Sequence, residues 1–119
     1  AVHFGIGCLG RMEGGEVFVP KIPSLRVVDL ARAGGPECDI DFVGIRPGEK
    51  INEVLISEDE ASYTVEFEDM YMVQPRFPWW EQGHVDGGQS LPEGFRYSSD
   101  TNPRWLSGEQ MAAMIAGVK

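Results

Sequence analysis

Short apolar stretches alternate along the chain with turns that are rich in glycine and proline. Alternating apolar and polar positions predict strands at residues 16–19, 63–67 and 70–74, and the acidic pair between the last two predicts a hairpin. Residues 39–45 also alternate and predict a strand. Residues 50–57 fit a helical turn followed by a strand, and periodicity does not decide over so few positions.

Helical spacing occurs in three places. Apolar residues at 2, 6, 9 and 12 predict a weak helix over residues 1–12, because Gly5, Gly7 and Gly10 each lower the helix propensity. A second helix is predicted from Leu25 to about residue 33, and residues 57–60 form an acidic turn or helix start. Ser107 with Gln110 has the pattern of a capping box and predicts a short closing helix.

From about residue 75 to residue 103 the pattern is mostly that of a loop. A loop of this length inside a compact domain is usually functional or covers a partner surface. Trp79 and Trp80 lie in it and fit either a plug in a hydrophobic gap or a platform that stacks on a sugar or base. Short strands with a few short helices predict the α+β class, with residues 1–119 as one region.

Composition narrows the function classes. The chain has 119 residues, 42% of them hydrophobic and 24% charged, which is typical of one globular domain or part of one. A net charge of −9 without a basic run argues against a nucleic-acid surface, and no stretch approaches the roughly 20 apolar residues of a membrane span. Two cysteines in unrelated contexts do not make a disulfide framework and predict a reduced, cytoplasmic setting.

The tetrapeptide Arg46-Pro47-Gly48-Glu49 is the main candidate for chemistry. Pro-Gly forces a tight turn, which we expect at the end of the strand predicted over residues 39–45. The guanidinium suits two phosphate oxygens, and the carboxylate suits ribose hydroxyls, so the turn fits a nucleotide diphosphate. The competing interpretation is a surface turn in which Arg46 and Glu49 pair with each other or with water.

Other candidates are weak. The histidines and cysteines (His3, Cys8, Cys38 and His84) lack the close pairing of a zinc site, and the acidic groups lack the spacing of a calcium loop, so no metal site is predicted. Gly5, Gly7 and Gly10 match a dinucleotide fingerprint, but no strand precedes them.

Four segments carry a family resemblance: GEVFVPKIPS at 15–24, GIRPGEK at 44–50, EVLISEDEA at 53–61, and FRYSSDTNP at 95–103 with Trp105-Leu106. In this order they strongly resemble the C-terminal part of the inverting UDP-N-acetylglucosamine 4,6-dehydratases. These enzymes form the polysaccharide-biosynthesis branch of the extended short-chain dehydrogenases/reductases. The resemblance covers nearly the whole chain and implies the small substrate-binding portion of that fold, without its Rossmann domain.

The resemblance also implies roles for single residues. Arg46 would contact the substrate's diphosphate, and Glu49 would help to hold its nucleoside end. Lys21 would lie near the same pocket, although packing or helix entry explains this residue as well. Asn52 stands where family members usually have His, a departure that touches no known catalytic duty.

What the chain lacks completes the expectation. It has no glycine-rich turn after a strand, no Tyr-x-x-x-Lys pair and no family catalytic cluster, so no catalytic residue is assigned to it. The resemblance places these parts upstream, in a Rossmann domain that binds NADP and would be a partner of this chain. The intact enzyme would be a homo-oligomeric lyase acting on a UDP-sugar, and we expect the chain alone to be catalytically silent.

In that enzyme the resemblance implies oxidation at carbon 4 of the sugar, loss of the carbon-6 hydroxyl as water, and return of the hydride with inversion at carbon 5. Two other interpretations stay open. One is a stand-alone or degenerate nucleotide-sugar-binding module without catalysis. The other is a portion of a related nucleotide-sugar epimerase, because the Arg-Pro-Gly-acidic turn is shared more widely.

Overall fold

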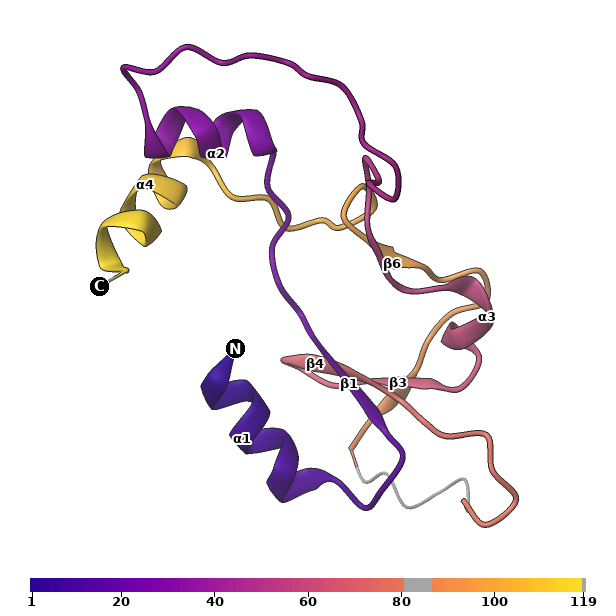
Figure 1. Cartoon of the computed structure of the whole chain (residues 1–119). Coiled ribbons are helices and arrows are strands. Elements are labelled where there is room, and N and C mark those ends of the chain that lie inside the picture. The colour runs from indigo at the N-terminus through magenta and orange to yellow at the C-terminus, as the bar shows by residue number, and fades with distance from the viewer. Residues whose placement is uncertain (81–86, 119) are drawn as a thin grey trace. The chain divides into compact units, whose positions relative to one another are not determined.

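The computed structural model describes residues 1–80 and 87–118, so the histidine at 84 and part of the predicted 75–103 loop lie outside the described residues. The chain divides into two compact units, one made of residues 1–21 and 54–97 and the other of residues 22–53 and 98–119 (Figure 1). We call them unit 1 and unit 2. Helices and short antiparallel strands occur together, which confirms the α+β class.

Unit 1 is built on an antiparallel sheet with the strand order β1-β4-β3-β5. Its strands are β1 (Val17–Pro20), β3 (Thr64–Glu66), β4 (Met70–Val73) and β5 (Gln89–Ser90). The predicted hairpin is confirmed, because β3 pairs with β4 and the Phe67 amide donates to the Met70 carbonyl at 2.8 Å. Figure 1 shows β1, distant in sequence, beside β4.

One face of this sheet forms the core of unit 1. Val19, Tyr71 and Val73 alternate with residues of the opposite face and pack with Ile56, which is fully buried. The Tyr71 ring lies 4.9 Å from that of Tyr97 and 5.5 Å from that of Phe95, measured between centroids. The aromatic rings thus supply much of the apolar surface that a small sheet needs.

Two further strands, β2 (Val54–Ile56) and β6 (Tyr97–Ser98), make a separate two-stranded sheet. Of the helical turn and the following strand expected within residues 50–57, the strand forms at 54–56, while 50–53 are not helical. The acidic segment after β2 is α3 (Glu58–Ala61), which begins with a capping box between Ser57 and Glu60. The first helix, α1 (Val2–Arg11), is confirmed and contains all three of the early glycines.

Unit 2 contains α2 (Val27–Gly34), which begins two residues later than predicted, and α4 (Gly108–Gly117), which packs against it. The capping box of α4 is confirmed: the Ser107 hydroxyl accepts from the Gln110 amide at 3.2 Å, and the Gln110 side chain accepts from the Ser107 amide at 2.9 Å. None of the helices in the described residues is both long and apolar enough to cross a membrane.

The strand predicted over residues 39–45 is wrong. These residues are extended but unpaired, and nearly all of the segment from 36 to 53 is exposed. A strand must exchange its backbone hydrogen bonds with a neighbour, and no described strand lies alongside this one. Ile40 and Phe42 alternate with Asp39 and Asp41 as in a strand, but without a partner strand all four side chains stay exposed.

Candidate functional site

The turn at Arg46 forms as predicted. The Glu49 amide donates to the Arg46 carbonyl at 3.1 Å, and Gly48 has φ +88°, a value that favours glycine at this position of a type II turn. The Glu49 carboxylate closes the turn from the other side, because its Oε2 accepts from the Arg46 amide at 2.9 Å. The turn is thus held at both ends, but it lies in a loop of unit 2 instead of at a strand end.

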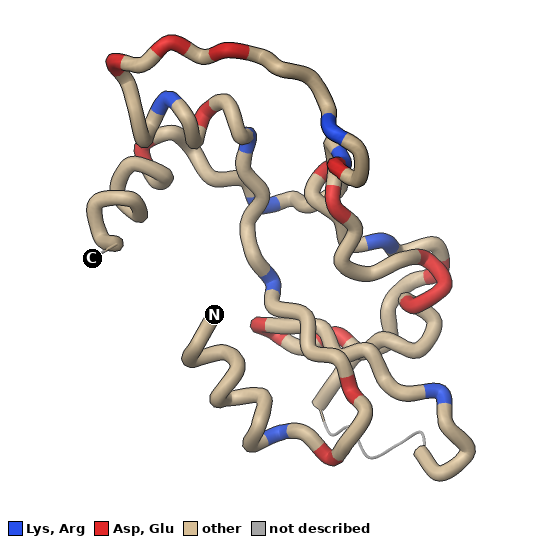
Figure 2. Tube along the Cα trace, viewed as in Figure 1, with Lys and Arg blue, Asp and Glu red and all other residues tan. Residues whose placement is uncertain are grey.

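This arrangement leaves the guanidinium of Arg46 available. The recorded ion pairs of the described residues are Arg11–Asp69 and Lys21–Glu66, so Arg46 and Glu49 are not paired through their charged groups. Figure 2 shows acidic positions on the earlier part of the 36–53 loop and basic positions further along it. In the sequence, Arg46, Glu49 and Lys50 are the charged residues at the turn. In a chain with net charge −9, this turn and the residue after it thus carry two cations, Arg46 and Lys50, beside one carboxylate, Glu49, and the cations suit an anionic ligand.

Only one carboxylate oxygen of Glu49 is used within the turn. Its Oε2 is used by the Arg46 amide, while Oε1 has no recorded partner in the described part of the chain. A carboxylate oxygen held in this way is a suitable acceptor for a sugar hydroxyl. The pair can accordingly supply donors to a phosphate and an acceptor to a ribose.

Lys21 lies in unit 1, at the end of β1. Its Nζ is 2.7 Å from the Glu66 carboxylate and 5.0 Å from the centroid of the Tyr71 ring, and the side chain is 21% exposed. These contacts occupy the ammonium within its own unit, which favours the packing explanation of Lys21. A contact with substrate stays a prediction.

Burial also changes the pKa of Tyr71, whose ring contacts the Lys21 ammonium. Desolvation, then the charge of Glu66 and the neighbouring Tyr97, raise the pKa of the Tyr71 phenol. Tyr71 therefore stays neutral at physiological pH and acts as part of the core.

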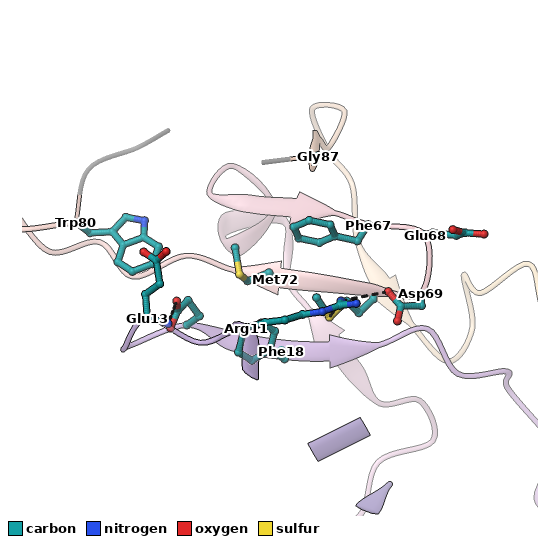
Figure 3. Close-up of a pocket in the computed structure, with 11 residues that line it drawn as sticks. Arg11, Glu13, Phe18, Phe67, Glu68, Asp69, Met72, Trp80 and Gly87 are labelled. Atoms are coloured by element: carbon teal, nitrogen blue, oxygen red, sulfur yellow. Dashed lines mark hydrogen bonds and ion pairs between the residues drawn. The ribbon is translucent and has the colours of Figure 1, made fainter. Parts of the chain in front are cut away.

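A pocket of about 670 Å³ lies on the other face of the unit 1 sheet (Figure 3). Its apolar lining includes Phe18, Phe67 and Met72, and its rim combines Arg11 with four carboxylates, those of Glu13, Glu16, Glu68 and Asp69. Figure 3 shows Arg11 reaching Asp69, at 3.7 Å between Nη1 and Oδ1. Among the described lining residues, four carboxylates surround a single arginine. These carboxylates would repel a diphosphate, so the pocket is unsuited to such a ligand.

Glu16 has a structural duty at this rim. Its carboxylate accepts from the amides of Glu13 at 2.7 Å and Gly14 at 2.8 Å. Partial burial opposes ionisation, but these backbone hydrogen bonds outweigh it and lower the pKa of Glu16. The carboxylate closes the turn that leads into β1.

The two tryptophans differ. Trp79 is 64% exposed and stacks on Phe77, with ring centroids 5.2 Å apart and planes 10° apart. Trp80 is half-buried and meets Trp79 edge-on. Trp80 lines the pocket of Figure 3, while Trp79 and Phe77 present an exposed aromatic surface.

The three early glycines do not form a dinucleotide-binding turn. Gly5, Gly7 and Gly10 lie inside α1, where the backbone amides are used within the helix, and not in a turn between a strand and a helix. Both cysteines are free thiols, and the described residues hold no cluster of three or more potential metal ligands.

Sequence reasoning missed one polar contact near the turn. Ser99 forms two hydrogen bonds with the backbone of Glu53, the residue that ends the loop carrying Arg46. The run Ser98-Ser99-Asp100 was a usable signal, because Ser and Asp side chains bond to nearby backbone in turns.

The sequence model of the family described as "Polysaccharide biosynthesis protein" matches residues 1–75, and the chain belongs to this family. Within it, the chain is 39% identical over 96% of its length to the inverting UDP-N-acetylglucosamine 4,6-dehydratases of two strains of Campylobacter jejuni subsp. jejuni. The resemblance noted in the sequence is thereby confirmed. The chain spans only 36% of the length of these relatives.

A solved structure is also similar. The X-ray structure of Pen from Bacillus thuringiensis matches 94% of this chain with a TM-score of 0.77 and 28% sequence identity. The match covers 34% of that chain. Both comparisons thus relate the 119 residues to about a third of a larger protein.

Proposed function

We propose that this chain is the nucleotide-sugar-binding portion of an NADP-dependent, inverting UDP-N-acetylglucosamine 4,6-dehydratase of surface polysaccharide or glycan biosynthesis. The observation that carries the proposal is the closed Arg46–Glu49 turn, whose guanidinium has no ion-pair partner among the described residues. The similarity to two curated dehydratases over nearly the whole chain supports the choice of substrate.

In this proposal the chain binds and orients and does no chemistry itself. Arg46 holds the diphosphate with its fork of donors, and Glu49 accepts from the ribose. NADP supplies the hydride chemistry from a part of the enzyme outside these 119 residues. Binding energy gained at the nucleotide then helps to orient the sugar, which lies away from the contacts.

Three parts of the expectation remain predictions: the contact of Lys21 with substrate, a homo-oligomeric enzyme and a cytoplasmic setting. The lyase assignment applies to the intact enzyme. A catalytically silent binding module is the main competing function, and it shares the Arg46 site.

Calorimetry with the Arg46→Ala variant of the full-length protein tests the proposal. We expect binding of UDP-N-acetylglucosamine to weaken by about 2–3 kcal/mol, the scale of a charge-assisted pair of hydrogen bonds. Arg46→Lys keeps the charge without the fork and should recover only part of this loss.

Arg32→Ala is the matched control, since it removes an exposed arginine of unit 2 from the end of α2. Its affinity should equal that of the wild type. Unchanged affinity in Arg46→Ala would refute the assignment of the diphosphate site.

A further inference from the structure

The turn at residues 98–102 is fixed by its own side chains. The Ser98 hydroxyl donates to the Asp100 carboxylate and lies 2.9 Å from the Thr101 hydroxyl. The backbone amide of Asn102 donates to the Ser98 carbonyl at 3.1 Å. Ser98 is only 2% exposed. A buried hydroxyl with several partners of this kind makes a stiff turn.

Asn102 ties this turn to a second segment of unit 2. Its side-chain amide donates to the Ile22 carbonyl at 2.7 Å, and its side-chain oxygen accepts from the Arg104 amide at 3.0 Å. Asn102 is 7% exposed, so both bonds are largely shielded from water. The turn is therefore a firm point of attachment within the unit.

Ser99 projects from this turn to Glu53. The Ser99 amide donates to the Glu53 carbonyl at 2.9 Å, and the Ser99 hydroxyl accepts from the Glu53 amide at 3.1 Å. One residue thus satisfies both backbone groups of Glu53, as a neighbouring strand would otherwise do.

This clamp matters because the loop before it has little other support. Between residues 39 and 52, the hydrogen bonds recorded in the described chain are the two inside the Arg46–Glu49 turn. Glu53 lies four residues beyond Glu49, a span of at most about 14 Å of extended chain. A tether this short restricts where the turn can go, and each bond that fixes Glu53 reduces the number of positions that the turn can sample.

We propose that Ser99 is a positioning residue for ligand binding: it clamps Glu53 and thereby holds the Arg46–Glu49 turn in place for the diphosphate of a nucleotide. This inference rests on the proposed function for its ligand, but the clamp itself is independent of it. Ser99 would act through the turn and would not touch the nucleotide.

The test uses three variants of the full-length protein. Ser99→Ala removes the hydroxyl bond and keeps the backbone bond, and Ser99→Thr restores a hydroxyl. Ser62→Ala is the matched control, because it removes one hydroxyl-to-backbone bond, to the Asp59 carbonyl, in unit 1.

The first readout is hydrogen exchange at the amides of Arg46 and Glu49, which bond within the turn and not to Ser99. Exchange should be about threefold to tenfold faster in Ser99→Ala, the range that one lost hydrogen bond supports. Ser99→Thr should return it to the wild-type rate, and Ser62→Ala should not change it. Unchanged exchange in Ser99→Ala would overturn the clamp.

The second readout is the affinity for UDP in a double-mutant cycle with Arg46→Ala. Ser99→Ala alone should weaken binding by about threefold to tenfold, and the double variant should lose clearly less than the sum of the two single losses, because only Glu49 of the turn is then left to position. Additive losses would overturn the positioning role. Wild-type affinity in Arg46→Ala would refute the proposed function and with it the ligand of the clamp. Because exchange is measured without UDP, the two failures can be told apart.

Discussion

At the scale of single residues, the role of a side chain depends on the contacts that it makes in the fold, and its place in a motif does not reveal these contacts. Lys21 and Arg46 both resemble substrate contacts by motif. Lys21 has a carboxylate at 2.7 Å and an aromatic ring beneath it, whereas the Arg46 guanidinium has no ion-pair partner in the described residues. Contacts between residues 45 positions apart, such as Lys21 and Glu66, cannot be read from local sequence.

The Lys21–Glu66 pair leads to a prediction about stability. In a double-mutant cycle of Lys21→Met and Glu66→Gln, we expect a coupling energy of about 0.5–1 kcal/mol, because the pair is close and partly shielded. Denaturant unfolding measures it. The Arg11–Asp69 pair is longer, 3.7 Å, and more exposed, so its own cycle should give a coupling near zero. Equal coupling energies in the two pairs would show that the shielding of Lys21 from solvent does not strengthen its ion pair.

At the scale of elements, capping motifs and the hairpin were predicted well, because their bonds are local. Ser107 and Gln110 start α4 as the sequence indicates, and β3 and β4 pair across a three-residue connection. The strand predicted at residues 39–45 failed for the opposite reason. Alternation shows which side chains are apolar, but a strand also needs a partner, and that depends on the rest of the fold.

The capping box of α3 leads to a prediction about pH. The amide and then the hydroxyl of Ser57 donate to the Glu60 carboxylate and lower the pKa of Glu60 below its usual 4.5. A lowered pKa stabilises the fold above the unfolded value, and this contribution is lost as pH falls through the folded value. Wild type should therefore exceed Glu60→Gln in unfolding free energy by about 0.5 kcal/mol at neutral pH, and the gap should close below pH 4.5.

Unfolding in denaturant at a series of pH values measures this gap. Glu58→Gln is the control, since Glu58 precedes the capping box residue on the same helix and takes no part in the box. If the difference in unfolding free energy between wild type and Glu58→Gln closed to the same extent, the effect would come from any negative charge at the helix start and not from the capping box.

At the scale of the whole molecule, family and fold class followed from the sequence, while the organisation into two units did not. Each unit joins segments that are far apart in the chain, residues 1–21 with 54–97 and residues 22–53 with 98–119. Such pairings depend on contacts like those of Ser99 with Glu53 and Asn102 with Ile22, which local patterns do not specify. The Arg46 turn was predicted from its Pro-Gly pair, but its setting in a clamped loop was not.

The central claim is that Arg46 binds a diphosphate, and the most direct test compares UDP with uridine by calorimetry in the wild type and in Arg46→Ala. The account predicts that the wild type binds UDP more tightly than uridine and that Arg46→Ala loses at least about tenfold of this preference. Affinity for uridine should be nearly the same in both proteins, because the nucleoside does not reach the guanidinium. An undiminished preference for UDP in Arg46→Ala would contradict the account.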